Sequence, residues 1–410
     1  MIVRKIHPDE VRRTEELFSI SFDSPYNNEQ SALELYEQYC SHPESRVQEF
    51  CLERFAAFED DNKTMTSCIV TQPFHVNFDG HNELMYSIGN VSTLPQYRGC
   101  GGIREIFKMV LPYLYKQNVC FSYLYPFSNS FYRHFGYEIC CKRQIFRLKL
   151  DKLPRFKTDG SCYLLDQNSK DIAASDIPEI YEQWQKRYNM MVLPVSYDYS
   201  FIEKADPYKD QEFTYIYRSR SDRPLSYMTF KNIRSGNERI MNCTSFMYTC
   251  TEGLKGLLSL AGTFLSHSSY IQFPLPENLC PDPVFSEWTD DAVKCNMDYY
   301  GMVRAVNVAE VLKKARYKNT GSISITITDD FIPENNHTFH IVFENGTCTT
   351  LTIDDGNVDI SLSIGAFSSF ITGVYDTCNL SESDSVKIYN EHAPLGQIFY
   401  KKPIFINTYF

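Results

Sequence analysis

The order of apolar and polar positions over residues 1–147 predicts a mixture of strands and helices. A helix is expected at residues 9–19, where Val11, Leu17 and Phe18 fall on one side. A turn signal at Asp79-Gly80 separates two of the strands. The expected strands lie at residues 3–6, 64–78, 85–94 and 119–125. Such an alternation is typical of a mixed α/β domain.

The same order of elements recurs over residues 148–297. Strand patterns at 225–231 and 238–248 precede a helix pattern at 251–267, and a further strand pattern follows at 269–274. The two segments share little sequence identity. The recurrence nevertheless predicts that the second segment repeats the architecture of the first.

Residues 298–410 have a different character. A helix is expected at 308–315 and another at 364–373, with strand-like alternation at 322–328, 338–343 and 349–353. Asn345-Gly346 is a hairpin turn signal between the last two strands. This α+β section contains no obvious catalytic constellation. The sequence therefore predicts three domains, 1–147, 148–297 and 298–410, of α/β and α+β class.

Composition and charge narrow the function classes. The chain has 410 residues, of which 43% are hydrophobic and 22% are charged, so a packed core is expected. No apolar run approaches the roughly 20 residues of a membrane helix, and the first residues lack the apolar region of a signal peptide. A cytoplasmic location is expected. The net charge of −11 argues against a general nucleic-acid binder and suits a cationic substrate, although solubility alone explains it equally well.

The cysteines do not form a metal-binding pattern. The chain has 14 of them, scattered, and none are spaced Cys-x-x-Cys. A zinc ribbon or a thioredoxin-type site is therefore disfavoured, and no metal is expected. In a reducing compartment most of these thiols pack as small apolar groups.

A glycine- and arginine-containing turn carries the chemistry of the first domain. The strand at 85–94 ends at Pro95, and Arg98-Gly99-Cys100-Gly101-Gly102 leads into an amphipathic helix. The helix has apolar residues at Ile103, Ile106, Phe107, Val110, Leu111 and Leu114. Glycines allow a ligand to approach the backbone, and the N–H groups of a helix N-terminus bind phosphate. A plain strand-to-helix turn is the alternative interpretation of this segment.

Two other nucleotide sites do not fit this turn. It has no Gly-Lys-Ser/Thr ending, which a phosphate loop of the NTPase type requires. It also lacks the three spaced glycines and the later acidic residue of a dinucleotide-binding fold.

A second motif, Phe131-Tyr132-Arg133-His134-Phe135-Gly136-Tyr137, follows the strand at 119–125. Together with Pro95-Gln96-Tyr97-Arg98-Gly99-Cys100-Gly101 it resembles the acyl-CoA core of the GNAT acetyltransferases. The whole chain resembles the Eis ("enhanced intracellular survival") family of GNAT N-acetyltransferases, strongly over residues 85–150 and more loosely at Met302-Val303-Arg304 and at the aromatic C-terminal end. The common GNAT loop has glycine at the place of Ile103. Members of the Eis family carry an apolar residue there, as this chain does.

The resemblance implies an architecture. It implies a GNAT domain at 1–147, a second GNAT-like domain at 148–297, and a domain similar to sterol carrier proteins at 298–410. It also implies a homo-oligomer, a hexamer in this family. Since no arginine–glycine turn precedes the helix at 251–267, the second domain is expected to bind no CoA.

The resemblance also implies the binding residues for acetyl-CoA, which would serve as co-substrate. The backbones of Val91 and Thr93 would bind the pantetheine arm and the acetyl carbonyl. The pyrophosphate would be held by Arg98, Gly99, Gly101, Gly102 and Arg104. In some relatives further arginines stand where this chain has Gly99 and Cys100.

Two catalytic groups follow from the same resemblance. Tyr132 matches the general acid of the family, and a phenol with a pKa near 10 is a suitable donor to a departing thiolate. The free C-terminal carboxylate, on Phe410, matches the group that accepts the proton of the amine. Phe22 and Asp23 are candidate substrate contacts at the end of the first helix.

The sequence thus predicts direct acetyl transfer to a primary amine of a cationic small molecule, such as an aminoglycoside or a polyamine. A protein-lysine acetyltransferase and a catalytically silent acyl-CoA- or lipid-binding protein remain alternatives. The identity of the acceptor is left open.

Overall fold

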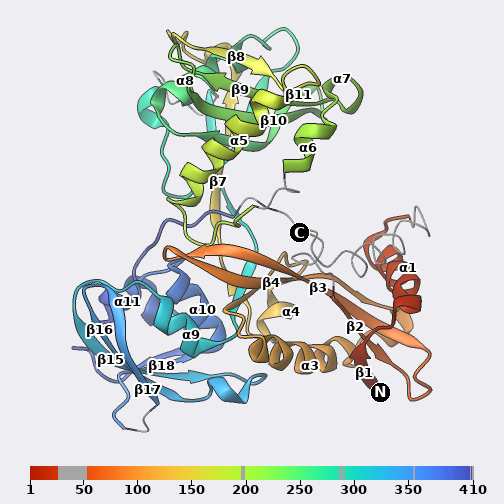
Figure 1. Cartoon of the computed structure of the whole chain (residues 1–410), viewed down its shortest axis with the longest axis vertical. Coiled ribbons are helices and arrows are strands. Elements are labelled where there is room, and N and C mark those ends of the chain that lie inside the picture. The colour runs from red at the N-terminus through yellow and green to blue at the C-terminus, as the bar shows by residue number, and fades with distance from the viewer. Residues whose placement is uncertain are drawn as a thin grey trace. The chain divides into compact units, whose positions relative to one another are not determined.

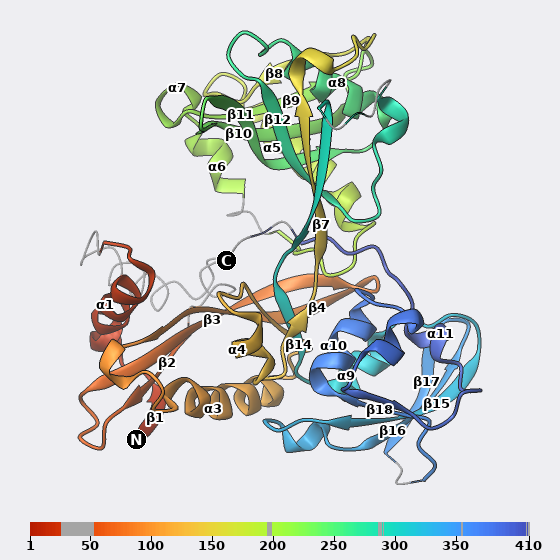
Figure 2. The same cartoon turned by 180° about the vertical axis from the view of Figure 1, so that it is seen from behind.

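The computed structural model describes residues 1–25, 53–194, 199–285, 289, 291–353, 356–406 and 408. The chain divides into two compact units (Figures 1 and 2). The first comprises Met1–Cys140, Tyr300–Lys402 and Thr408–Phe410, and the second comprises Cys141–Tyr299 and Pro403–Asn407. Among the described residues, no helix is long and apolar enough to cross a membrane.

A seven-stranded sheet forms the larger part of the first unit. Its strands, in spatial order, are β1 (Ile2–Lys5), β2 (Glu53–Phe58), β3 (Met65–Phe78), β4 (His81–Thr93), β5 (Phe121–Leu124), β14 (Met302–Ala305) and β6 (Glu138–Ile139). All neighbours are antiparallel except β4 and β5, which are parallel. The predicted turn between β3 and β4 is confirmed, since Asp79 and Gly80 both have the positive φ that a two-residue hairpin turn requires.

Helices cover both faces of this sheet. Successive side chains of a strand point to opposite faces, so β2 contacts a helix on each side. The ring of Phe55 lies 5.5 Å from Tyr113 of α3 (Gly102–Lys116), whereas Ala56 and Phe58 pack with residues of α1 (Val11–Phe22). The predicted apolar face of α3 is confirmed, because its six members are buried; they are Ile103, Ile106, Phe107, Val110, Leu111 and Leu114.

The second unit repeats the first sheet. Its strands, in spatial order, are β8 (Ser161–Leu164), β9 (Glu212–Arg218), β10 (Pro224–Ser235), β11 (Glu238–Tyr248), β12 (Tyr270–Pro276), β7 (Lys142–Lys149) and β13 (Val293–Tyr299). The parallel pair again stands fourth and fifth, as β11 and β12, and all other pairs are antiparallel. The repeat expected from the sequence is therefore confirmed in topology.

The two repeats exchange one strand each. In the first sheet the sixth place is filled by β14, which follows β13 of the second sheet along the chain. In the second sheet the sixth place is filled by β7, which follows β6 of the first sheet. The predicted domain boundaries at 147/148 and 297/298 fall inside β7 and β13, because the periodicity of one strand does not reveal its partners.

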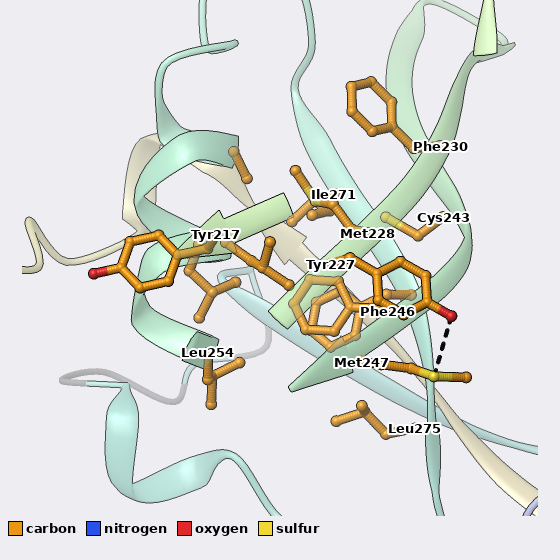
Figure 3. Packing of buried hydrophobic residues seen from close by; sticks show 14 of the residues in the cluster. Tyr217, Tyr227, Met228, Phe230, Cys243, Phe246, Met247, Leu254, Ile271 and Leu275 are labelled. Atoms are coloured by element: carbon orange, nitrogen blue, oxygen red, sulfur yellow. Dashed lines mark hydrogen bonds between the residues drawn. The ribbon is translucent and has the colours of Figure 1, made fainter. Parts of the chain in front are cut away.

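Aliphatic, aromatic and sulfur-containing side chains together fill the core of the second unit (Figure 3). Phe246 of β11 stacks on Phe273 of β12 with ring centroids 4.0 Å apart. The hydroxyl of Tyr227 lies 3.3 Å from the sulfur of Met247, as the dashed line in Figure 3 shows. Helices α5 (Lys170–Gln185) and α8 (Thr251–Gly262) contribute buried residues to the same core.

A third sheet belongs to the first unit. Its order is β17 (Thr347–Ile353), β16 (Thr338–Glu344), β15 (Gly321–Thr328), β18 (Ile360–Ser363) and β19 (Val386–Ile388). Helices α9 (Val308–Lys314), α10 (Ile364–Thr372) and α11 (Leu395–Ile398) accompany it (Figure 2). The predicted turn between β16 and β17 is confirmed, with positive φ at Asn345 and Gly346.

A buried ion pair joins this section to the first sheet. The ammonium of Lys402 donates to Asp79 at the β3–β4 turn (2.6 Å) and to the carbonyl of Ile371 (2.9 Å). Asp79 also accepts the N–H of Arg316 (2.7 Å). Burial lowers the pKa of Lys402, while the carboxylate of Asp79 opposes that shift.

Candidate active site

A pocket of about 690 Å³ lies beside the start of α3 in the first unit. Its lining comes from the end of α1, from β4 and its following turn, and from the segment after β5. The lining residues are Ser21, Phe22, Val91, Thr93, Tyr97, Arg98, Gly99, Gly101, Gly102, Ile103, Arg104, Phe127, Phe131 and Phe135. All seven residues predicted to bind acetyl-CoA are among them.

The pocket opens where β4 and β5 stop pairing. Their parallel register runs from Met85↔Phe121 to Ile88↔Leu124 and ends there. Two residues later Asn90 takes a left-handed backbone conformation, with φ 49°, and the register against β3 shifts by one residue. Such a bulge bends and twists a strand. As a result β4 continues along β3, and no strand within the described part of the chain pairs with its other edge there.

This geometry leaves two backbone donors of β4 facing the opened edge. The N–H of Leu94 donates to the carbonyl of Thr66 on β3 (2.9 Å). Since N–H groups alternate in direction along a strand, those of Thr93 and Val91 point away from β3. The hydroxyl of Thr93 donates to the buried hydroxyl of Ser67 (3.0 Å), which fixes the side chain beneath the turn.

The turn that follows is built to present further backbone donors. A short 3₁₀ segment, Pro95–Tyr97, leads to Gly99 and Gly101, whose φ values of 80° and 84° lie in the left-handed region. Gly101 caps α3, and the N–H of Glu105 is the first to bond back to it (3.1 Å). The N–H groups at residues 102–104 precede that bond, so the helix itself offers them no acceptor.

Gly102 allows α3 to lie directly on β3. A Cβ atom there would stand 2.5 Å from the hydroxyl oxygen of Ser67 and 3.7 Å from Cβ of Ala57. No side chain fits at that distance without a shift of Ser67 or of the helix. The glycine is therefore required by packing under the turn, whereas Gly99 and Gly101 have open space and are required for their backbone conformation.

Two arginines supply positive charge at the same place. The side chains of Arg98 and Arg104 are exposed and line the pocket. Neither makes an ion pair with any described residue. Guanidinium groups next to unsatisfied N–H groups at a helix N-terminus make a site for phosphate groups.

An aromatic wall, which we define as Phe127, Phe131 and Phe135, also lines the pocket. Adjacent rings lie 5.2 Å apart, and Phe135 stacks on Phe107 of α3 at 4.2 Å. Phe127 is 68% exposed. These rings were not predicted to line the pocket, although their spacing of four residues is visible in the sequence.

Tyr132 lies behind the aromatic wall on the short helix α4 (Asn129–Arg133). Its side chain is 3% exposed, it does not line the pocket, and it packs edge-to-face against Phe127 and Phe131. Among the described residues its hydroxyl has no hydrogen-bond partner. Burial raises the pKa of Tyr132 above that of an ordinary phenol, with a smaller contribution from Tyr137, so the side chain keeps its proton.

The two predicted substrate contacts differ in position. Phe22 lines the pocket at the end of α1 and stacks on Phe18 at 4.6 Å. Asp23 does not line it. Asp23 is the exposed, left-handed C-cap of α1 (φ 49°), and its backbone N–H donates to Ser19. Ser21, for which no role was predicted, does line the pocket.

Phe410 lies outside the described residues, but a nearby residue is placed. The hydroxyl of Tyr125, directly after β5, donates to the carbonyl of Thr408. The ring of Tyr125 packs on Tyr300 with centroids 4.7 Å apart. Residue 408 therefore lies at the point where β4 and β5 separate. No sequence signal predicted this contact, since it joins residues 283 positions apart.

Among the described residues, no group of three or more His, Cys, Asp or Glu side chains is arranged to hold a metal ion. A second cavity of about 520 Å³ lies on the far side of α4. Its lining includes Arg133 and His134, together with Asp329, Asp330 and the start of α10.

Comparison with known proteins agrees with this geometry. Residues 2–140 match the GNAT acetyltransferase domain, and residues 308–405 match the sterol carrier protein domain. No curated protein sequence matches the chain. The chain therefore contains a GNAT acetyltransferase domain followed by a sterol-carrier-like domain, and it is an enzyme of the GNAT acetyltransferase class.

Several solved structures share the fold along the whole chain. Eis1 from Mycobacterium abscessus is 17% identical, with a TM-score of 0.78 and full coverage of both chains. A probable N-acyltransferase from Enterococcus faecalis V583 is 22% identical, with a TM-score of 0.84 and coverage of 100% of this chain and 99% of that one. A GCN5-related N-acetyltransferase from Anabaena variabilis is 16% identical, with a TM-score of 0.82 and full coverage of both. The chain thus has an Eis-like GNAT fold.

Proposed function

We propose that this protein transfers an acetyl group from acetyl-CoA to a primary amine of a small cationic acceptor. One observation carries the proposal. The opened edge of β4, the glycine turn with its free helix N–H groups, and the two exposed arginines all line one pocket. The edge of β4 suits a thioester with its pantetheine arm, and the glycine turn and the arginines suit a pyrophosphate.

The proposed reaction is a single displacement. The N–H groups of Val91 and Thr93 polarise the thioester carbonyl, and the amine nitrogen attacks its carbon. The new C–N bond forms as the C–S bond breaks. From the resemblance to the family's general acid we propose that Tyr132, which packs against the aromatic wall, gives its proton to the departing sulfur, and the amine loses one proton to a base. Since the raised pKa of Tyr132 keeps the phenol protonated, the residue acts as donor and not as base.

We propose the C-terminal carboxylate, on Phe410, as that base. Support comes from the resemblance to the Eis family and from Thr408, whose carbonyl is bound by Tyr125 beside the separated strands. The unperturbed pKa of such a carboxyl is about 3.3–3.7, so it would act on an amine through its charge and through a bridging water.

A cationic acceptor fits the charge of the chain. The net charge of −11 attracts cations toward the protein. Phe22, which lines the pocket, offers an apolar contact to the acceptor. From the same resemblance we propose a hexamer, which light scattering would detect as six times 47.7 kDa.

The deciding experiment measures release of CoA with a thiol reagent, using acetyl-CoA and a panel of polyamines and aminoglycosides. Amine-dependent release is expected. Tight binding of acetyl-CoA with no release of CoA, and with the same affinity in Tyr132→Phe, would instead indicate a silent acyl-CoA-binding protein. Transfer to a lysine peptide with none to small amines would indicate a protein acceptor.

Removal of Phe410 tests the base separately. We expect turnover to fall by at least tenfold while calorimetry shows unchanged affinity for acetyl-CoA, because the truncation moves the carboxylate by one residue. Tyr125→Phe, which removes the hydrogen bond to Thr408 and leaves the carboxylate in place, is the matched comparison and should lose less. Full turnover in the truncated protein would rule out this base.

A further inference from the structure

Arg304 is a fully buried cation next to the proposed site. It lies on β14, where Met302↔Leu124 and Ala305↔Phe121 fix the register against β5. Its side chain is 0% exposed. The guanidinium donates three hydrogen bonds, to the carbonyl of Phe135 (2.8 Å), to the carbonyl of Ala305 (2.9 Å) and to the carboxylate of Asp329 (2.5 Å).

Asp329 holds that guanidinium from the sterol-carrier-like domain. It follows β15, and its carboxylate also accepts the N–H groups of Phe331 (2.9 Å) and Ile332 (3.2 Å). The other carboxylate oxygen accepts the amide of Asn335 (2.9 Å). The carboxylate is therefore held in one orientation by four donors, including the guanidinium of Arg304, and it presents a fixed anion to Arg304.

The carbonyl of Phe135, which also accepts a hydrogen bond from Arg304, belongs to the turn that carries Tyr132. The carbonyl of Tyr132 accepts the N–H groups of Phe135 (2.9 Å) and Tyr137 (3.3 Å). Between them stands Gly136, with φ 78°, where a Cβ would come within 3.1 Å of the guanidinium of Arg304. The backbone of this turn is thus packed directly against Arg304.

We infer that Arg304 and Asp329 are positioning residues for acetyl transfer, acting through the carbonyl of Phe135 on the backbone that holds Tyr132. This inference rests on the proposed function of Tyr132. In this arrangement the sterol-carrier-like domain contributes Asp329 to the acetyltransferase site, so the domain is part of the catalytic apparatus.

A purely structural role does not account for this choice of residues. A buried ion pair contributes little net stability, and apolar residues of similar volume often serve as well. The strand that carries Arg304 is already held by backbone pairing with β5 and β6. What apolar residues could not supply is a rigid donor to the carbonyl of Phe135, which also lines the pocket through its ring.

The test is a double-mutant cycle between Asp329→Asn and Tyr132→Phe. Asp329→Asn keeps the shape of the side chain and weakens its hold on Arg304. Since small misplacements of a reacting group can cost up to about 100-fold in rate, we expect kcat to fall by roughly 10- to 100-fold. Affinity for acetyl-CoA, measured by calorimetry, should change by less than about twofold. The matched control is Asp330→Asn, whose exposed neighbouring carboxylate accepts no hydrogen bond from Arg304.

The decisive quantity is the loss caused by Asp329→Asn in the Tyr132→Phe background. Positioning predicts almost no further loss of kcat there. An equal loss in both backgrounds, or an unchanged kcat of Asp329→Asn, would overturn the inference. If Tyr132→Phe alone retains full activity, the proposed acid role fails first, and that single variant identifies this case.

Folding of the variants is checked by circular dichroism and thermal unfolding. If Asp329→Asn does not fold, the neutral pair Arg304→Gln/Asp329→Asn replaces it, because it leaves no unpaired buried charge. The same cycle with Tyr132→Phe then gives the same two outcomes. Additive losses overturn the inference, and the absence of a further loss supports it.

Discussion

The two repeated sheets have the same arrangement of strands. They differ at the point where their parallel strands separate, because a pocket opens there in the first sheet and packed side chains lie there in the second. In the first sheet the pairing of β4 with β5 ends at Ile88 and Leu124, and a pocket opens. In the second sheet the pairing of β11 with β12 ends at Asn242 and Gln272, and a bulge follows after the same interval, at Thr244. The bulged frame alone therefore does not make a site.

The side chains just beyond the separation make the difference. The fourth residue after the last pair is Ser92 in the first sheet and Phe246 in the second. Phe246 stacks on Phe273 across the separated strands, and Trp184 donates to the carbonyl of Tyr248 (2.9 Å). The second repeat thus has two stacked rings just beyond the separation, whereas the first has Ser92 and Tyr125 at the same places and a pocket lined by Val91 and Thr93.

The helix starts differ as well. Residues 94–101, with their glycines and Arg98, separate β4 from α3, whereas residues 249 and 250 alone separate β11 from α8. The first turn of α8 carries Glu252, which accepts the hydroxyl of Tyr217 (3.1 Å). A carboxylate at a helix N-terminus uses the charge that would otherwise attract phosphate. The frame thus has a glycine–arginine turn before α3 and a two-residue connection before α8, with Glu252 at the second position of the helix.

The largest effect is expected from removing the rings of the second repeat. Trp184→Ala should lower the free energy of unfolding by about 3–5 kcal/mol, since it empties a buried site against Phe405 and Tyr188. Urea denaturation followed by circular dichroism measures this. Ile172→Ala, at an exposed position of the same helix, is the control and should change little. Affinity for acetyl-CoA gained by Trp184→Ala would contradict the comparison.

A smaller effect is expected where α3 rests on β3. Gly102→Ala should cost about 1–3 kcal/mol of stability, because the added methyl meets Ser67, and it should weaken acetyl-CoA binding by tilting the helix N-terminus. Gly262→Ala in α8 is the matched change in the other repeat. It has open space, and we expect it to be neutral or stabilising by about 0.4–1 kcal/mol. Equal effects from both variants would show that helix propensity, and not contact with Ser67, decides.

Removal of one guanidinium should affect binding alone. Arg98→Ala is expected to raise the Kd for acetyl-CoA roughly tenfold, the low end for a charge-assisted hydrogen bond, because Arg98 is exposed. Isothermal calorimetry at two salt concentrations measures it, and the difference from the native protein should shrink at high salt. The exposed Arg220 of the second unit provides the control. An unchanged Kd for Arg98→Ala would remove the assignment of the turn to phosphate.

The smallest effect concerns pH. Burial raises the pKa of Tyr132 and of Tyr227 in the two repeats, so both stay protonated in the folded protein at pH values where a free phenol ionises. Below pH 10 their contribution to stability is constant, and above pH 10 it is lost as pH rises, because the unfolded chain releases these protons first. Tyr132→Phe and Tyr227→Phe should each reduce the loss of stability between pH 10 and 11. The ratio of native to Tyr132→Phe turnover should stay constant from pH 7 to 9.5.

Local signals predicted much of this molecule. The glycines at 99, 101 and 102 identified the turn, because backbone conformation and close packing both exclude other residues there. The apolar spacing of α3 identified its buried face. Asp23 stays a predicted substrate contact, named from its place in the chain, and the structure shows its backbone as the C-cap of α1. Residue type alone does not distinguish these two roles.

Contacts between distant segments were not predictable. A strand of four residues such as β14 carries too little pattern to show that it pairs with β5. The bond from Tyr125 to Thr408 and the pair of Arg304 with Asp329 depend on that pairing and on a third sheet. The sequence shows Phe127 as one of three phenylalanines spaced by four residues. Only the packing shows that its ring lines the pocket.

The exchange of β7 and β14 determines the order in which the chain can mature during synthesis. When residue 140 leaves the ribosome, the acetyltransferase sheet still lacks its sixth strand, and the edges of β5 and β6 have no partner. That strand becomes available after the whole second repeat has been made. The nascent first repeat therefore remains an incomplete sheet until β14 has been synthesised. Chaperones protect intermediates of this kind. A gene fragment that stops at residue 140 would release this unfinished sheet permanently.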